Sequence, residues 1–305
     1  MKKILCYIMA FAIIISFSGC KSNSKTNVNV PKEKNSKTQG ISLDIMVTNK
    51  YLYNIVKSLT GDKDNVQFMF SKDDSNIRQF KYTSDSLNNI SKYDLFIYTS
   101  ADFEPWVSGF QNKLDKSKIG AIDVSRGTKM NSLDKDDKKS DENIDKNPYY
   151  WGNFDNYNTV LLNIRNALEE KDPKSRDYYE EKFKSCVKAV RDMEKEFKDV
   201  VKDFDDYTFV TTQYKFDYFF SYNGLKSVKV KTQVKGTPVQ DISDKISNQN
   251  KVCFIYDDDK DLNDNIELVK KYSMKTLKFN IYYENGNLVD MMKKNEASMK
   301  KIINN

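Results

Sequence analysis

The chain has 305 residues and a formal net charge of +6; 39% of its residues are hydrophobic and 13% are aromatic. This length is enough for two ordinary domains, and this apolar content excludes a chain that is disordered throughout. Its 50 basic and 44 acidic residues are interspersed, whereas a nucleic-acid-binding surface requires clustered basic residues, so no nucleic-acid partner is expected. There is no histidine, which removes the usual general base at neutral pH and the commonest transition-metal ligand.

Residues 1–19 have the pattern of a lipoprotein signal peptide. Two lysines precede an apolar run, residues 4–15, which is shorter than the ~18–20 residues that a bilayer span needs. The following Phe17-Ser18-Gly19-Cys20 resembles the bacterial lipobox. We therefore expect lipid on Cys20 and a position on the outer face of the bacterial cytoplasmic membrane. The alternative is an ordinary cleaved signal or a short anchor.

Two further segments are too polar to build a core. Residues 20–41 are mainly Lys, Asn, Ser and Thr, which predicts a flexible tether, and residues 129–148 are dense in charge, which predicts a mobile surface loop. Beyond Cys6 and Cys20, the cysteines are Cys186 and Cys253. A disulfide between these two is possible outside the cell, but two buried thiols acting as small apolar fillers are favoured.

Residues 42–128 predict an N-terminal α/β lobe. Strand patterns cover residues 41–47, 66–70, 93–98 and 119–124, and helix patterns cover residues 49–59 and 84–90, with a further helix from Asp102. Strands that alternate with helices indicate a parallel sheet covered on both faces.

Residues 149–206 predict a linking helical segment, with one long amphipathic helix over Lys174–Phe204 that would span about 45 Å. Residues 207–305 repeat the strand–helix alternation and predict a C-terminal α/β lobe. Its strand patterns cover residues 208–211, 227–230, 252–256 and 276–279, and its helix patterns cover residues 215–222, 242–246, 262–272 and 288–303. The expected architecture is α/β: two lobes with parallel sheets covered by helices, joined by one long helix, with a cleft between the lobes.

Several runs between residues 42 and 300 together carry a family resemblance. They are Val47–Val56, Ser91–Tyr98 with Phe103–Val107, Asp172-Pro173 with Tyr178-Tyr179, Phe209–Gln213 with Tyr222–Leu225, and Met291–Asn295. The chain resembles the zinc/manganese-type (ZnuA/TroA-like) solute-binding lipoproteins of ABC importers. This resemblance implies two lobes around a cleft, an ABC permease as partner, a small solute as cargo, and a divalent metal, Zn or Mn, as that solute.

The four positions that correspond to the family's metal ligands carry other residue types here. The family uses mostly histidines and carboxylates, whereas this chain has Arg78 (or Ile77 if the register slips by one), Tyr149, Gln213 and Asn280. A permanent cation at Arg78 would repel a metal, and neutral amide and phenol oxygens are weak ligands for zinc or manganese. The resemblance therefore predicts a divergent member in which binding of the family's metal is doubtful.

Aromatic residues stand beside these positions in the sequence. They are Tyr149, Tyr150, Trp151, Tyr214 and Phe216. Together with Arg78 and Gln213 they could hold an organic ligand, for example an anionic one. Equally, the rings could fill a cleft that no longer opens, and Arg78 could pair with a nearby acid as a structural bridge.

The acidic residues Asp257, Asp258, Asp259 and Asp261 resemble a calcium cluster but lack the glycine and distal glutamate of an EF-hand loop, so helix capping after a strand is favoured.

No catalytic constellation is visible, because there is no histidine, no serine-centred elbow and no phosphate-binding glycine loop. Two functions remain: a solute-binding lipoprotein of an ABC importer, or a surface interaction protein, adhesin-like as some relatives of the family are, that has lost transport.

Overall fold

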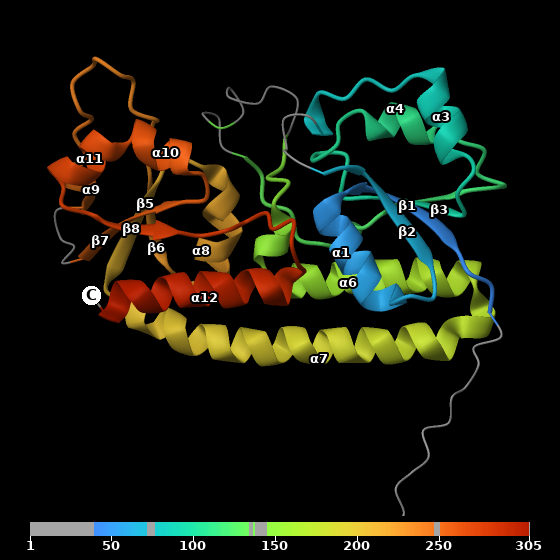
Figure 1. Ribbon diagram of the computed structural model, residues 1–305. Helices are drawn as coiled ribbons and strands as arrows, with labels where there is room; N and C mark the ends of the chain where they lie inside the picture. The colour runs from blue at the N-terminus through green and yellow to red at the C-terminus, as the bar shows by residue number, and fades with distance from the viewer. Residues whose placement is uncertain (1–39, 72–76, 134–136, 138–144, 247–250, 305) are drawn as a thin grey trace, which may run out of the picture. The chain divides into compact units, whose positions relative to one another are not determined.

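A computed structural model describes residues 40–71, 77–133, 137, 145–246 and 251–304. The expected signal peptide, nearly all of the expected tether and much of the charged segment 129–148 lie outside these residues. Two parallel four-stranded sheets and their helices form the described part of the chain (Figure 1). Within this part, no helix is both long enough and apolar enough to cross a membrane.

The first sheet contains the strands β1 (Asp44–Asn49), β2 (Asn65–Phe70), β3 (Leu95–Tyr98) and β4 (Gly120–Asp123) in the order β2-β1-β3-β4. All neighbouring strands are parallel, with Ile45 opposite both Val66 and Leu95. Every residue of β3 is buried, as expected for a central parallel strand with helices on both faces.

The helices of the first lobe begin and end where local chemistry favours it. Helix α1 (Lys50–Thr60) is capped by the Asn49 side chain, which accepts a hydrogen bond from the Leu52 amide, and it ends at Gly61, whose φ is +53°. Helix α3 (Ser84–Ile90) has a capping box between Thr83 and Ser86. The last helix of the lobe, α4 (Val107–Gln111), is short.

The segment between the two sheets contains a helix, α6 (Phe154–Lys171), and the long connecting helix, α7 (Arg176–Val201). Helix α6 follows a 3₁₀ turn, η1 (Tyr150–Gly152). After a second turn, η2 (Pro173–Ser175), the chain enters α7, which ends in η3 (Lys202–Phe204). Helix α7 contacts α1 and α6 and, further along, α12 (Leu288–Asn304), so one helix packs against both lobes (Figure 1).

The second sheet repeats the topology of the first in the order β6-β5-β7-β8, again all parallel. Its strands are β5 (Tyr207–Thr211), β6 (Lys226–Lys229), β7 (Lys251–Tyr256) and β8 (Lys275–Lys278). Around it lie η4 (Tyr214–Phe216), α8 (Asp217–Asn223), α9 (Ser243–Ile246), α10 (Asp259–Asp264), α11 (Ile266–Lys271) and α12. The predicted α/β class, with two parallel sheets and one long connecting helix, is confirmed.

Three expectations about individual helices were wrong in detail. The helix expected from Asp102 begins only at Val107, after a turn in which Glu104 accepts backbone hydrogen bonds. The helix expected over residues 262–272 is divided into α10 and α11 at Asn265, whose side-chain amide donates to the Asp261 carbonyl. The long helix is shorter than Lys174–Phe204, since both of its ends are 3₁₀ turns.

Candidate functional site

The carboxyl ends of the strands are where parallel α/β sheets position binding groups, at the point where the strand order reverses. In the first sheet this point lies between β1 and β3, and in the second between β5 and β7. We call these two places the first edge and the second edge. The first edge is formed by Thr48, Asn49, Thr99, Ser100 and Glu104, and the second by Thr212, Gln213, Lys215, Asp257 and Asp261.

The first edge is organised around one buried carboxylate, that of Glu104. Its Oε1 accepts hydrogen bonds from the Thr48 hydroxyl at 2.6 Å, the Asn49 amide at 3.3 Å and the Thr99 backbone N–H at 3.3 Å. Its Oε2 accepts from the Ser100 backbone N–H at 2.9 Å. Burial raises the pKa of Glu104 to about 7, although these hydrogen bonds lower it. Glu104 therefore joins the ends of β1 and β3 from within the core.

The rings predicted to line a cleft pack against one another and against both lobes. The Tyr149 ring lies 5.6 Å from that of Trp151 and 6.0 Å from that of Tyr214, measured between centroids. Trp151 is 2% exposed, and its indole N–H donates to the carbonyl of Ile281 at 2.7 Å. The Tyr150 hydroxyl donates to the carbonyl of Thr99 at 2.7 Å. These rings thus connect the first lobe to the segment that follows β8.

The four positions that the resemblance predicts to correspond to metal ligands have different surroundings. Tyr149 belongs to the aromatic group just described, and Gln213 precedes Tyr214 in the same turn. Asn280 is bonded to Asn295, whose Oδ1 accepts from the Asn280 backbone N–H at 2.7 Å and side-chain amide at 2.9 Å. Ring packing therefore joins Tyr149 to Tyr214, the neighbour of Gln213, whereas Asn280 is bonded to helix α12.

Arg78 and Phe216 have other immediate neighbours. Arg78 is half-buried in a short helical turn, next to Ile77, whose carbonyl accepts from the Trp106 indole at 2.7 Å. Phe216 is fully buried in the core of the second lobe, where its ring contacts those of Phe220 and Phe279.

The second edge combines two carboxylates with one ammonium group. Lys215 Nζ donates to Asp257 Oδ2 at 2.7 Å and lies 5.7 Å from the centroid of the Tyr149 ring. Asp261 Oδ1 accepts from the Thr212 hydroxyl at 2.6 Å and from the Asn265 amide at 3.1 Å. Burial, and then the nearby Asp257, raise the pKa of the Asp261 carboxyl. Asp258 caps α10, as the sequence predicted for this acidic run.

Neither Glu104 nor Lys215 was predicted from the sequence as a site residue. Asp261 was predicted only as part of a helix-capping run, whereas it accepts hydrogen bonds from Thr212 and Asn265. Glu104 was visible only as part of the most specific family run, and a glutamate followed by Pro105 and Trp106 in an apolar context could have indicated a buried acid. Lys215 and the two aspartates come from segments about forty residues apart in the sequence, and no local pattern joins them. Their proximity follows only from the parallel pairing of β5 with β7.

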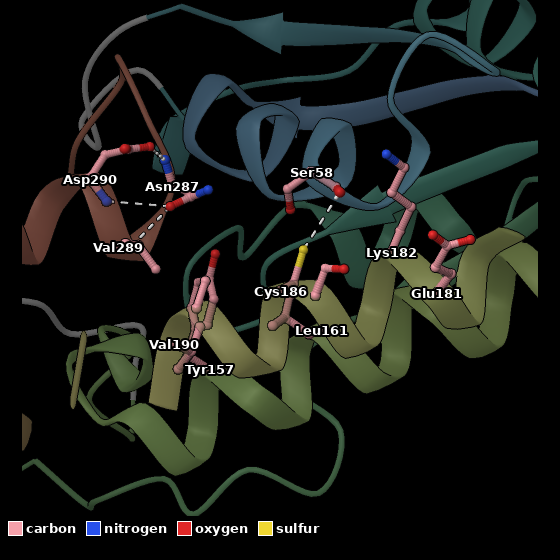
Figure 2. A pocket seen from close by; sticks show the side chains of 12 residues that line it. Ser58, Tyr157, Leu161, Glu181, Lys182, Cys186, Val190, Asn287, Val289 and Asp290 are labelled. Carbon is pink, nitrogen blue, oxygen red and sulfur yellow. Dashed lines mark hydrogen bonds between the residues drawn. The ribbon is translucent and has the colours of Figure 1, made fainter. Parts of the chain in front are cut away.

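A pocket of about 330 Å³ lies among the helices, and none of the residues that line it belongs to either edge (Figure 2). It is lined by residues of α1, α6, α7 and the start of α12, including Ser58, Tyr157, Cys186 and Asp290. Figure 2 shows the Cys186 thiol directed at the carbonyl of Ser58, with which it forms a hydrogen bond of 3.5 Å.

Cys186 is half-buried and Cys253 is buried, and both are free thiols. Burial raises the pKa of both, that of Cys253 to about 12, so neither is an activated thiolate.

Within the described ranges, no group of three or more His, Cys, Asp or Glu side chains is arranged to hold a metal ion. The positions discussed above instead offer phenol and amide groups, which bind zinc and manganese weakly. The chemistry that these residues supply is hydrogen bonding, aromatic packing and acidic charge.

Comparison with known proteins shows one family throughout. The model of the family described as zinc-uptake complex component A, periplasmic (ZnuA), matches residues 45–302. A metal ABC transporter substrate-binding lipoprotein from Lactococcus lactis subsp. lactis (strain IL1403) is 27% identical over 252 residues, which cover 78% of this chain and 75% of that protein.

Solved structures share the fold. The metal-dependent lipoprotein YcdH from Bacillus subtilis matches with a TM-score of 0.69 and 20% identity, over 84% of this chain and 98% of that one. A mutant of the laminin-binding adhesin Lmb from Streptococcus agalactiae matches with a TM-score of 0.67 and 20% identity, over 86% of this chain and 99% of that one.

Proposed function

This chain belongs to the family of zinc-uptake complex component A proteins, and from that premise we propose that it is the extracytoplasmic solute-binding lipoprotein of an ABC importer. Cys20 would carry the lipid, and the body would capture a solute and present it to the permease. Both steps are binding events, and the hydrogen-bonding and charged groups of the second edge are suited to binding rather than to covalent catalysis. The activity expected of the chain is therefore that of a receptor and not of an enzyme.

The solute that best suits these residues is an organic molecule rather than zinc or manganese. The observation that carries this proposal is the chemistry of the four corresponding positions, which are Arg78, Tyr149, Gln213 and Asn280. The Asn280 amide is bonded to Asn295, and the Tyr149 ring packs on aromatic neighbours. Ring faces, amides and a few charges are the groups that recognise organic ligands in receptor sites.

Elemental analysis tests the proposal directly. The protein would be purified without chelator and assayed for Zn, Mn and Fe, then analysed by native mass spectrometry for retained small molecules. We expect less than stoichiometric metal and no rise in Tm when any of these metals is added, because a metal that binds only the native state would raise it. One tightly held transition-metal ion per chain, lost on substitution of Tyr149 or Gln213, would contradict the organic-solute proposal.

A surface interaction role is the alternative, and the similarity to the laminin-binding adhesin supports it. In that case the chain would bind a macromolecule and would need no permease. A permease and an ATPase encoded in the same operon, with co-purification of the permease, would favour transport. An orphan gene, together with binding of the purified chain to immobilised laminin, would favour the surface role.

A further inference from the structure

The second edge contains more hydrogen-bond acceptors than donors. Gln213 Oε1, Asp257 Oδ1 and Asp261 Oδ2 are buried oxygens for which no residue of the described ranges supplies a hydrogen bond. Asp261 is only 8% exposed. A buried acceptor without a donor is costly, and native proteins contain few of them.

These three oxygens belong to one small region. The hydrogen bond from Thr212 to Asp261 and the ion pair between Lys215 and Asp257 join the segment after β5 to the segment after β7, which includes the start of α10. Gln213 lies between Thr212 and Lys215 in the first of these segments. The charge of Asp257 also acts on Asp261, whose pKa it raises. The region therefore concentrates acceptors and negative charge where the strand order reverses.

Lys215 indicates which kind of group this region stabilises. Its ammonium nitrogen bonds Asp257 Oδ2 at 2.7 Å and faces the Tyr149 ring at 5.7 Å from the centroid. A carboxylate and an aromatic face are the two partners that proteins use to hold organic ammonium groups. Lys215 satisfies one oxygen of Asp257 and leaves the other, Oδ1, among the three acceptors without a donor.

We propose that the second edge binds the ammonium group of a small organic amine through Gln213, Asp257 and Asp261. This proposal rests on the proposed function and specifies its solute as a cation. An ammonium group brings N–H donors and a positive charge, the two properties that the three oxygens need. A transition metal fits less well, because amide and carboxylate oxygens beside a resident ammonium group form a poor site for it. An anionic solute would face the two aspartates and is disfavoured.

The test uses the full chain in detergent and isothermal titration calorimetry. The probes are putrescine, spermidine and ethanolamine, with succinate as an anionic control and Mn²⁺ and Zn²⁺ as metal controls. We expect at least one amine to bind with one-to-one stoichiometry, and the controls not to compete with it. Asp257→Asn and Asp261→Asn should each weaken binding about tenfold or more, because each removes a charge-assisted hydrogen bond.

Two further variants separate a site from a general effect of charge. Asp259→Asn removes an acid from the same loop, but Asp259 is 70% exposed and pairs with Lys278, so amine affinity should not change. Lys215→Met removes the resident ammonium group and should strengthen amine binding, since the ligand no longer competes with it. Circular dichroism and Tm for each variant establish that it is folded.

The outcomes for the two proposals are distinct. Failure of all three amines to bind at millimolar concentration, or binding that survives Asp261→Asn, would overturn the amine site. If a different organic molecule is then found in the purified protein, the receptor function stands without the amine site. Stoichiometric zinc or manganese would instead overturn both the amine site and the organic solute, and would leave a receptor for a metal.

Discussion

At the first edge, both oxygens of the Glu104 carboxylate accept hydrogen bonds, from Thr48, Asn49, Thr99 and Ser100. At the second edge, Asp261 is nearly as well buried, yet only its Oδ1 has donors, from Thr212 and Asn265. The two sheets have the same strand topology. The difference lies in the side chains that the loops after the strands supply.

This difference distinguishes Glu104, whose carboxylate has a structural role, from Asp261, whose carboxylate has an oxygen available to a ligand. A buried carboxylate whose oxygens are all matched by fixed donors holds its surroundings together, and a ligand has nothing to add to it. A buried carboxylate with an unmatched oxygen lowers stability until a donor arrives. The first edge therefore contributes to folding, whereas the second edge is the one proposed to bind a ligand, although the two occupy equivalent places in the two lobes.

Removal of the two acids should affect stability very unequally. Glu104→Ala leaves the donors of Thr48, Asn49, Thr99 and Ser100 without their acceptor and creates a cavity, so we expect a loss of about 3–5 kcal/mol in the free energy of unfolding. Asp261→Ala leaves fewer donors behind and should cost about 1 kcal/mol. Urea denaturation followed by circular dichroism measures both. Equal losses in the two variants would remove the distinction between the edges.

Stability should also depend on pH through Glu104. Its pKa is about 7 in the folded chain and 4.5 ordinarily, so the folded state binds more protons between these values and stability falls as the pH rises through this window. One pKa unit corresponds to about 1.4 kcal/mol, which gives a loss of about 3 kcal/mol by pH 8. Unfolding measured at pH 4.5, 6 and 8 tests this. The free energy of unfolding should depend less on pH in Glu104→Gln, because glutamine cannot titrate. An unchanged pH dependence in this variant would assign the effect to other groups.

The fold was accessible from the sequence because its signals are local. Apolar periodicity located all of the strands to within a few residues, and Gly61 and Gly224 marked the ends of α1 and α8. The start of α4 at Val107 and the interruption between α10 and α11 were not predicted, because side-chain contacts decide them. Glu104 holds the turn before α4, and Asn265 binds the Asp261 carbonyl and the Gln233 backbone N–H.

The site was less accessible, because its residues meet only through the sheet. Family resemblance indicated Gln213 and Tyr149, but nothing in the sequence joined them to Asp257 or Lys215. Burial was also hard to anticipate: Phe216 reads as one more aromatic residue beside Tyr214, yet it points into the core of the second lobe. The positions suggested by resemblance stay predictions until ligand binding is measured.

The two tryptophans sharpen the comparison between lobes. Each indole N–H donates to a backbone carbonyl at 2.7 Å, from Trp151 to Ile281 and from Trp106 to Ile77. Trp151→Phe and Trp106→Phe should each cost about 1–2 kcal/mol, since each leaves a buried carbonyl without its donor. Only Trp151→Phe should also speed hydrogen exchange in the segment after β8, because of the two indole bonds only that of Trp151 ends on this segment. If Trp106→Phe also speeds hydrogen exchange in the segment after β8, the two indole bonds do not stabilise separate parts of the chain.

The smallest expected effect has the opposite sign. Asp261→Asn keeps an amide oxygen for Thr212 and Asn265 and removes a negative charge that burial and Asp257 both disfavour. Because the pKa of Asp261 is raised in the folded state, its ionised form lowers stability at neutral pH, so we expect this variant to gain up to about 1 kcal/mol at pH 8. The gain should shrink as the pH falls and the wild-type carboxyl becomes protonated, which thermal unfolding at pH 4 and pH 8 measures. A variant that is more stable and yet binds amine less well would show that Asp261 is retained at the expense of stability. A loss of stability at pH 8 would mean that its Oδ2 already has a partner in the folded chain.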